Sequence, residues 1–144
     1  MLVQQILNSK ADLGVLSVKP TALVSEAVAI LSEKRIGTVV VSSDGHSLDG
    51  ILSERDIVRE LGRRGVGCLS EPVENLMTKK IVTCSTSDSA DFVLQTMTDG
   101  RFRHLPVVED GKTIGLISIG DVVKARLSEL AMEKDALQGM IMGH

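Results

Sequence analysis

The residues with the clearest chemical potential in this sequence are two Ser-x-x-Asp blocks, Ser53 with Asp56 and Ser118 with Asp121. One interpretation is structural, because a serine that begins a helix and an acid three residues later satisfy free backbone amides and complement the helix dipole. The other is functional, because a carboxylate at a helix N-terminus can accept hydrogen bonds from both vicinal hydroxyls of a ribose. Since capping and binding can use the same side chain, both interpretations stay open.

A second cluster combines two guanidinium groups and an imidazole in the run Arg101-Phe102-Arg103-His104. In a strand, Arg101 and Arg103 share one face and Phe102 and His104 share the other. The two arginines then either protect a sheet edge or clamp a phosphate with their planar N–H donors. A ribose site nearby favours the clamp.

The sequence offers no paired groups of the kind that catalysis needs. It contains no GxxxxGK[ST] phosphate loop, and His46, His104 and His144 have no metal-ligand spacing. Cys68 and Cys84 form neither a CxxC motif nor a disulfide framework, and we expect both to be inert thiols. We therefore predict no catalytic residue, no metal and no required cofactor.

Composition excludes several binding classes. The 144 residues carry a formal net charge of −3, which provides no basic surface for nucleic acid. With two phenylalanines and no tyrosine or tryptophan, the chain cannot build stacking platforms or aromatic cages. No apolar run is long enough to span a membrane, and the first residues do not form a signal-peptide pattern, so we expect a soluble cytoplasmic protein.

The sequence repeats itself at an offset of 66 and then 65 residues. Each copy reads strand, helix, strand, strand, helix. One copy of about 50 residues is too small to bury its sheet alone, so we expect the copies to pack into one compact module. The predicted divisions are an N-terminal segment (1–14), a first repeat (15–65), a linker (66–76), a second repeat (77–127) and a C-terminal helix and tail (128–144).

This duplicated unit resembles a tandem pair of CBS domains, the cystathionine-β-synthase-type regulatory repeat, as a standalone two-repeat protein. The resemblance covers roughly residues 15–127, and Arg103–Val108 and Gly115–Val123 stand in the order and spacing of the family. It implies an α+β fold in which two β-α-β-β-α repeats pack with pseudo-two-fold symmetry, with a short N-terminal segment and an extra C-terminal helix.

The resemblance also implies a function. Clefts between such repeats bind adenosine-containing ligands such as AMP, ADP, ATP, NAD(H) or S-adenosylmethionine. The protein is then expected to be a non-catalytic regulatory module and energy sensor that forms a flat homodimer. Its regulated protein is not identified by the sequence, and neither nucleic acid nor a membrane is an expected partner.

In the family pattern the aspartate holds the ribose and the serine contacts ribose or phosphate, which assigns Asp121 with Ser118 and Asp56 with Ser53. Backbone groups of the first strand and of the residues before the proline cradle the base. In the second copy these positions are Ile81, Val82, Thr83, His104 and Leu105, next to Pro106, and in the first copy they are Leu16, Ser17, Thr38 and Val39.

The two copies differ at positions that bear on binding. The second copy has Arg103, His104 and Pro106 where the first has a glycine, a threonine and a valine. The first copy has Arg55 where the second has Gly120, and Arg55 is expected to reach across to a phosphate bound beside the other repeat. We expect the cleft of the second copy to be the better site.

After the second repeat, Leu127, Leu130, Ala131 and Leu137 recur at helical spacing. Their apolar stripe either docks back onto its own module or contacts a partner subunit.

An alternative function is a ligand-independent dimerisation and protein-interaction module, in which both Ser-x-x-Asp blocks are only helix caps. An enzyme acting on a nucleotide is a third hypothesis, and it predicts turnover rather than binding.

Overall fold

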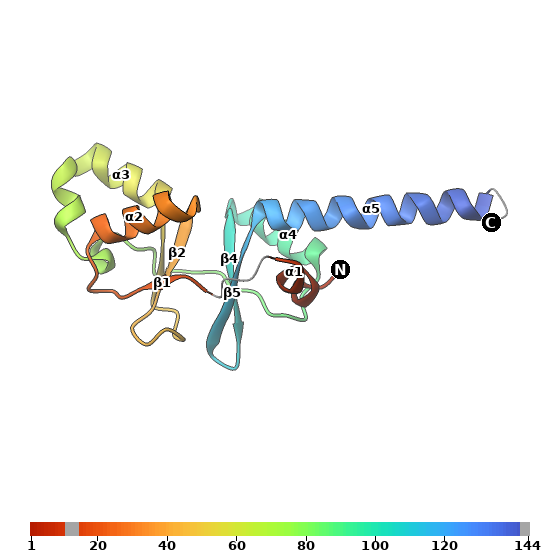
Figure 1. Cartoon of the computed structure of the whole chain (residues 1–144), viewed down its shortest axis with the longest axis horizontal. Coiled ribbons are helices and arrows are strands. Elements are labelled where there is room, and N and C mark those ends of the chain that lie inside the picture. The colour runs from red at the N-terminus through yellow and green to blue at the C-terminus, as the bar shows by residue number, and fades with distance from the viewer. Residues whose placement is uncertain (11–14, 142–144) are drawn as a thin grey trace.

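Two halves of the chain lie side by side in the computed structural model, which describes residues 1–10 and 15–141 (Figure 1). The first half holds a three-stranded sheet in the order β1-β2-β3, with β1 parallel and β3 antiparallel to β2. Val24 and Leu31 of its first helix share one apolar core with Val39 and Leu52 of the sheet. The elements are β1 (Ser17–Val18), α2 (Val24–Lys34), β2 (Thr38–Val41), β3 (Gly50–Ser53), α3 (Glu54–Arg64) and the 3-10 helices η1 (Val66–Ser70) and η2 (Val73–Asn75).

The second half has a core of its own beside an antiparallel pair of strands, β4 and β5. Val93 and Met97 of its first helix are buried there with Leu105 and Ile117 of the strands. Helix, strand, strand and helix therefore follow one another in both halves, as the internal repeat predicts, and the α+β fold is confirmed. The elements are α4 (Ala90–Gly100), β4 (His104–Glu109), β5 (Lys112–Ser118) and α5 (Ile119–Ile141).

The strand expected at the start of the second copy is reduced to one parallel bridge, between Cys84 and Val107. The difference arises at Pro106, which stands where the first half has Val40. Val40 donates its N–H to a backbone carbonyl just before β1 at 3.3 Å. A proline has no N–H to form the equivalent bond, so the second half cannot complete that ladder.

The N-terminal residues form a short helix, α1 (Val3–Ser9), which belongs to the second half. Val3 and Ile6 are buried in the core of that half, and Val3 N–H donates to the carbonyl of Asp88 at 2.9 Å. Gly115 of β5 permits the contact, because a Cβ there would lie 2.7 Å from a methyl carbon of Leu7. Residues 1–10, at the start of the chain, therefore form part of the second half.

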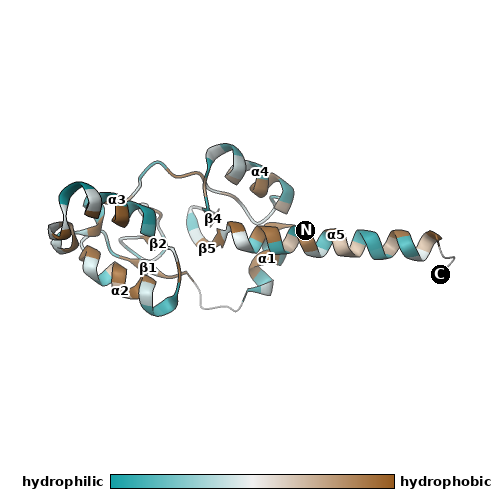
Figure 2. Cartoon of the chain, turned by 90° about the horizontal axis from the view of Figure 1, so that it is seen from above, coloured by the Kyte–Doolittle hydropathy of each residue, from teal (hydrophilic) through white to brown (hydrophobic). Residues whose placement is uncertain are grey.

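Helix α5 unites the last helix of the second repeat and the predicted C-terminal helix in one element of 23 residues. Its first part still contacts the second half through Arg126 and Glu129, which pair with Asp91 and the Met1 amino group. The rest projects away from both halves, and Figure 2 shows hydrophobic residues recurring along the helix. Leu127, Leu130 and Leu137 are 63%, 48% and 58% exposed, so this stretch does not dock back onto its own module. None of the helices in the described part of the chain is long and apolar enough to cross a membrane.

Candidate functional site

Two cavities lie where the halves meet, and both are lined by Gly37, Thr38 and His104. A hydrogen bond of 3.1 Å joins Thr38 Oγ1 and His104 Nδ1. These two residues are equivalent in the 66-residue repeat, so the bond lies at the centre of the internal symmetry. Burial lowers the pKa of His104; the charge of Asp121 opposes this shift and that of Lys10 adds to it. At neutral pH the imidazole is therefore uncharged.

The larger cavity, here called the Asp121 cavity, has a volume of about 610 Å³. Ser118 ends β5 and Asp121 lies in the first turn of α5. Ser118 N–H donates to Asp121 Oδ2 at 2.9 Å, and Asp121 N–H donates to Ser118 Oγ at 3.1 Å. The serine and aspartate therefore do cap the helix. The Asp121 side chain also stays 25% exposed and lines the cavity, so capping leaves it available for a ligand.

A lysine from the N-terminal helix also reaches this carboxylate. Lys10 follows α1 directly, and its Nζ donates to Asp121 Oδ2 and to the carbonyl oxygen of Leu116, both at 2.8 Å. Burial would raise the pKa of Asp121, but the hydrogen bonds and charge of Lys10 and the amide of Ser118 outweigh it, and the pKa is lowered. The carboxylate is ionised at neutral pH.

Lys10 and Arg35 line the Asp121 cavity, and the sequence analysis missed both. Nothing in the local sequence marks Lys10, because only the docking of α1 on the second half brings it to the cavity. Arg35 could have been identified from the sequence, because it aligns with the candidate residue Arg101 in the repeat. Both arginines end their helices in the left-handed conformation, with φ of 55° and 57°.

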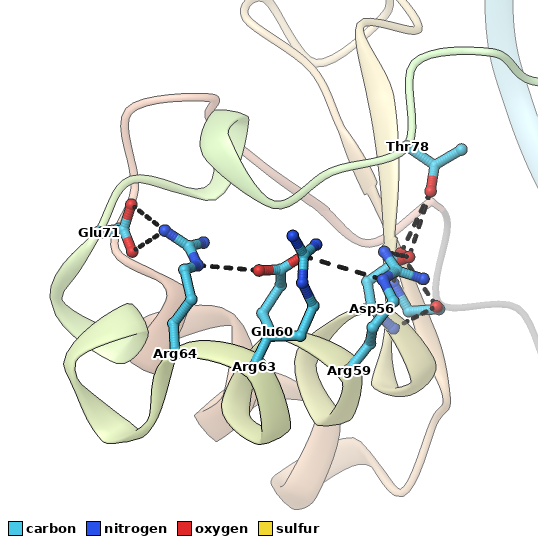
Figure 3. A network of polar contacts seen from close by, with 8 residues as sticks. Asp56, Arg59, Glu60, Arg63, Arg64, Glu71 and Thr78 are labelled. Carbon is cyan, nitrogen blue, oxygen red and sulfur yellow. Dashed lines mark hydrogen bonds and ion pairs between the residues drawn. The ribbon is translucent and has the colours of Figure 1, made fainter.

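The smaller cavity, here called the Asp56 cavity, has a volume of about 240 Å³. Ser53 and Asp56 cap α3 with the same reciprocal hydrogen bonds. Asp56 also accepts from Arg59 Nη2 at 2.9 Å and from Thr78 Oγ1 at 3.3 Å, in the network that Figure 3 shows. Its side chain is 7% exposed, so this carboxylate is far less open to a ligand than Asp121.

The arginines do not lie where the strand pattern places them. Strand β4 begins at His104, so the predicted alternation does not apply to Arg101 or Arg103. Both line the Asp56 cavity and not the Asp121 cavity, which corrects their expected place in the cleft of the second copy. Arg55 also lines the Asp56 cavity, beside its own repeat's serine and aspartate, and does not reach the other cleft.

Some of the residues predicted to contact the base line the cavities and others do not. Leu16, in the segment that leads into the first repeat, lines the Asp121 cavity of the second repeat. Thr78, in the segment that leads into the second repeat, lines the Asp56 cavity of the first repeat. Leu105 is buried in the core of the second half, which explains why it does not reach either cavity. The predicted positions outside the described lining of both cavities are Ser17, Val39, Ile81, Val82, Thr83, Leu105 and Pro106.

Both cysteines lie inside the cores of the two halves. Cys68 and Cys84 are buried and unpaired with each other, and burial raises the pKa of Cys84 to about 12. Across residues 1–10 and 15–141, no three His, Cys, Asp or Glu side chains are grouped to hold a metal ion.

Known proteins resemble this chain in sequence and in fold. CBSX3, mitochondrial, a CBS domain-containing protein of Arabidopsis thaliana, is 36% identical over 124 residues, covering 83% of this chain and 60% of its own length. The structure of a CBS-domain containing protein from Agrobacterium tumefaciens is 42% identical, with a TM-score of 0.81, and covers 88% of this chain and 99% of that one. The structure of CBSX2 in complex with AMP is 30% identical, with a TM-score of 0.72, and covers 88% and 96% of the two chains.

The family pattern described as the CBS domain matches the chain twice, over residues 9–63 and 73–128. These two matches correspond to the two halves of the structure and confirm the resemblance that the repeated motifs indicate. The chain therefore belongs to the CBS domain family, and its two halves form one tandem pair of CBS domains.

Proposed function

We propose that this protein is a non-catalytic regulatory module that binds an adenosine-containing ligand, AMP, ADP, ATP or NAD(H), in the Asp121 cavity. The observation that carries the proposal is the ionised, part-exposed carboxylate of Asp121 in a cavity of about 610 Å³. Ligand sites commonly occupy roughly 300–1,000 Å³. The similarity to CBSX2, whose structure holds AMP, supports an adenine nucleotide.

The mechanism is linkage between the ligand and the arrangement of the two halves. The Asp121 carboxylate accepts hydrogen bonds from the ribose hydroxyls, while Leu16 and Thr38 of the first half line the same cavity. A ligand that contacts both halves stabilises the arrangement it fits best. The partner protein reads that arrangement, so the module reports the energy state of its compartment without turnover. A cytoplasmic location stays a prediction, since one relative is named as mitochondrial.

Isothermal titration of nucleotide-free protein with AMP, ADP, ATP, NAD, NADH and S-adenosylmethionine tests this proposal. We expect micromolar binding of at least one adenosine ligand and at least about tenfold weaker binding by Asp121→Asn. Asp91→Asn is the matched control, because Asp91 also lies in the first turn of a helix of the second half. Equal affinity of Asp121→Asn and the wild type, or no binding by any of the six ligands, would contradict the proposal.

A second candidate, ligand-independent pairing of two copies, is favoured by the exposed face of α5. Val123, Leu127, Leu130, Leu137 and Ile141 are all exposed and recur at the three- and four-residue spacing of a coiled-coil seam. Lys134 occupies the remaining seam position. In a parallel pair the two Lys134 side chains would face each other, so the proposed homodimer joins the α5 helices antiparallel.

Sedimentation equilibrium of the whole protein tests the homodimer. Leu130→Glu places a charge in the seam and is expected to convert dimer to monomer. Met132→Glu is the matched control, because Met132 is 62% exposed and lies outside the seam. A monomeric wild type, or equal loss of dimer in both variants, would exclude pairing through this face. A stable dimer that binds none of the six ligands would favour the interaction module over the sensor.

A further inference from the structure

The Asp121 cavity contains two cations that the CBS motifs do not account for, Lys10 and Arg35. Lys10 enters from α1 and donates to Asp121 Oδ2 and to the Leu116 carbonyl. Arg35 enters from the opposite half, at the end of α2. The cavity therefore places two positive charges beside one negative charge, although the whole chain is acidic.

Lys10 and a ribose compete for the same acceptor. A ribose that donates to the Asp121 carboxylate would displace the Lys10 ammonium from Oδ2, and the partly buried ion pair is then lost. A ligand without charge offers no compensation for that loss. A phosphate offers a new anionic partner, and a lysine, with its flexible stem and three N–H donors, can turn toward it.

The Asp56 cavity lacks this arrangement. There the cation on the aspartate is Arg59, which lies one turn further along the same helix, α3, and Thr78 donates to the same carboxylate. Lys10 instead comes from a separate segment, fixed to the second half by Val3 and Ile6 of α1. Of the two cavities described, the Asp121 cavity is the one in which the ion pair on the aspartate joins two separate elements, the end of α1 and α5.

We infer that Lys10, with Arg35, forms a phosphate subsite of the Asp121 cavity, and that Lys10 exchanges the Asp121 carboxylate for the phosphate of the ligand. The cavity consequently selects phosphorylated adenosine over adenosine itself. This inference rests on the proposed binding function and adds the residues that set its preference. It also gives α1 a role, since this helix delivers Lys10 to the cavity.

Titration of the full chain with AMP and with adenosine tests the subsite. The wild type is expected to bind AMP at least about tenfold more tightly than adenosine. Lys10→Met is expected to reduce that ratio to about threefold or less, through weaker AMP binding and unchanged or tighter adenosine binding. Lys10→Arg, which keeps a cation at this position, should retain the preference, and Lys112→Met in the exposed β4–β5 hairpin is the matched control.

The outcomes separate this inference from the binding function. An unchanged ratio in Lys10→Met, with AMP still bound, overturns the subsite and leaves the nucleotide site standing. A ratio lost equally in Lys10→Met and Lys112→Met also overturns it. If neither the wild type nor Lys10→Met binds AMP or adenosine, the binding function fails and the subsite fails with it.

Discussion

At the scale of single residues, the two motif aspartates have the same local geometry and different surroundings. Each caps a helix and each accepts a hydrogen bond from a basic side chain. Asp56 is 7% exposed and is also bonded by Thr78, whereas Asp121 is 25% exposed and lines the larger cavity. The same motif therefore serves mainly structure in the first repeat and is open to a ligand in the second.

Removal of the two carboxylates should affect stability unequally. Asp56→Ala leaves Arg59, Thr78 and the Ser53 amide without their acceptor, and we expect it to lower the free energy of unfolding by about 2–3 kcal/mol. Asp121→Ala removes a helix cap and a part-exposed ion pair with Lys10, at a cost of about 1 kcal/mol. Urea unfolding of both variants measures the difference. A larger loss for Asp121→Ala would contradict this division of roles.

At the scale of elements, sequence patterns predict the repeated parts and fail where one segment depends on another. The order of helices and strands follows from two aligned copies, so the α+β fold and both Ser-x-x-Asp blocks are predictable. Helix α1 has only seven residues, and its burial depends on a core formed by residues more than seventy positions away. Lys10 could not be assigned to the Asp121 cavity without that docking.

The docking of α1 can be tested through its buried face. Ile6 is 2% exposed in the core of the second half, so Ile6→Ala is expected to lower the free energy of unfolding by about 2–4 kcal/mol. Leu2→Ala, at a position that is 45% exposed just before the helix, should cost far less. Chemical denaturation compares the two variants. Equal stability of Ile6→Ala and the wild type would show that α1 is not part of this half.

At the scale of the whole molecule, the two halves have separate cores and meet at the residues that line both cavities. Thr38 and His104 form the hydrogen bond at this junction, one from each half. Both residues also line the Asp121 cavity, which has walls from both halves. Under the proposed function, a ligand would act on the relation between the halves at this junction.

The junction should make stability depend on pH. The pKa of His104 is lowered from its usual 6.5, mainly by burial, so the folded protein binds this proton less readily than the unfolded chain. The contribution of neutral His104 to the free energy of unfolding is therefore complete above the pKa of this histidine in the unfolded chain. It is lost as the pH falls from that value toward the lower pKa of His104 in the folded protein. Between about pH 7.5 and pH 5.5, the free energy of unfolding should fall more for the wild type than for His104→Gln. Parallel pH profiles for the two proteins would contradict this prediction.

The most direct test of ligand binding in the Asp121 cavity is a crystal structure of the nucleotide-free protein after AMP is added. We expect AMP in the Asp121 cavity, with both ribose hydroxyls within hydrogen-bond distance of the Asp121 carboxylate and the Lys10 ammonium turned to the phosphate. AMP bound only in the Asp56 cavity, or with its ribose away from Asp121, would contradict the account.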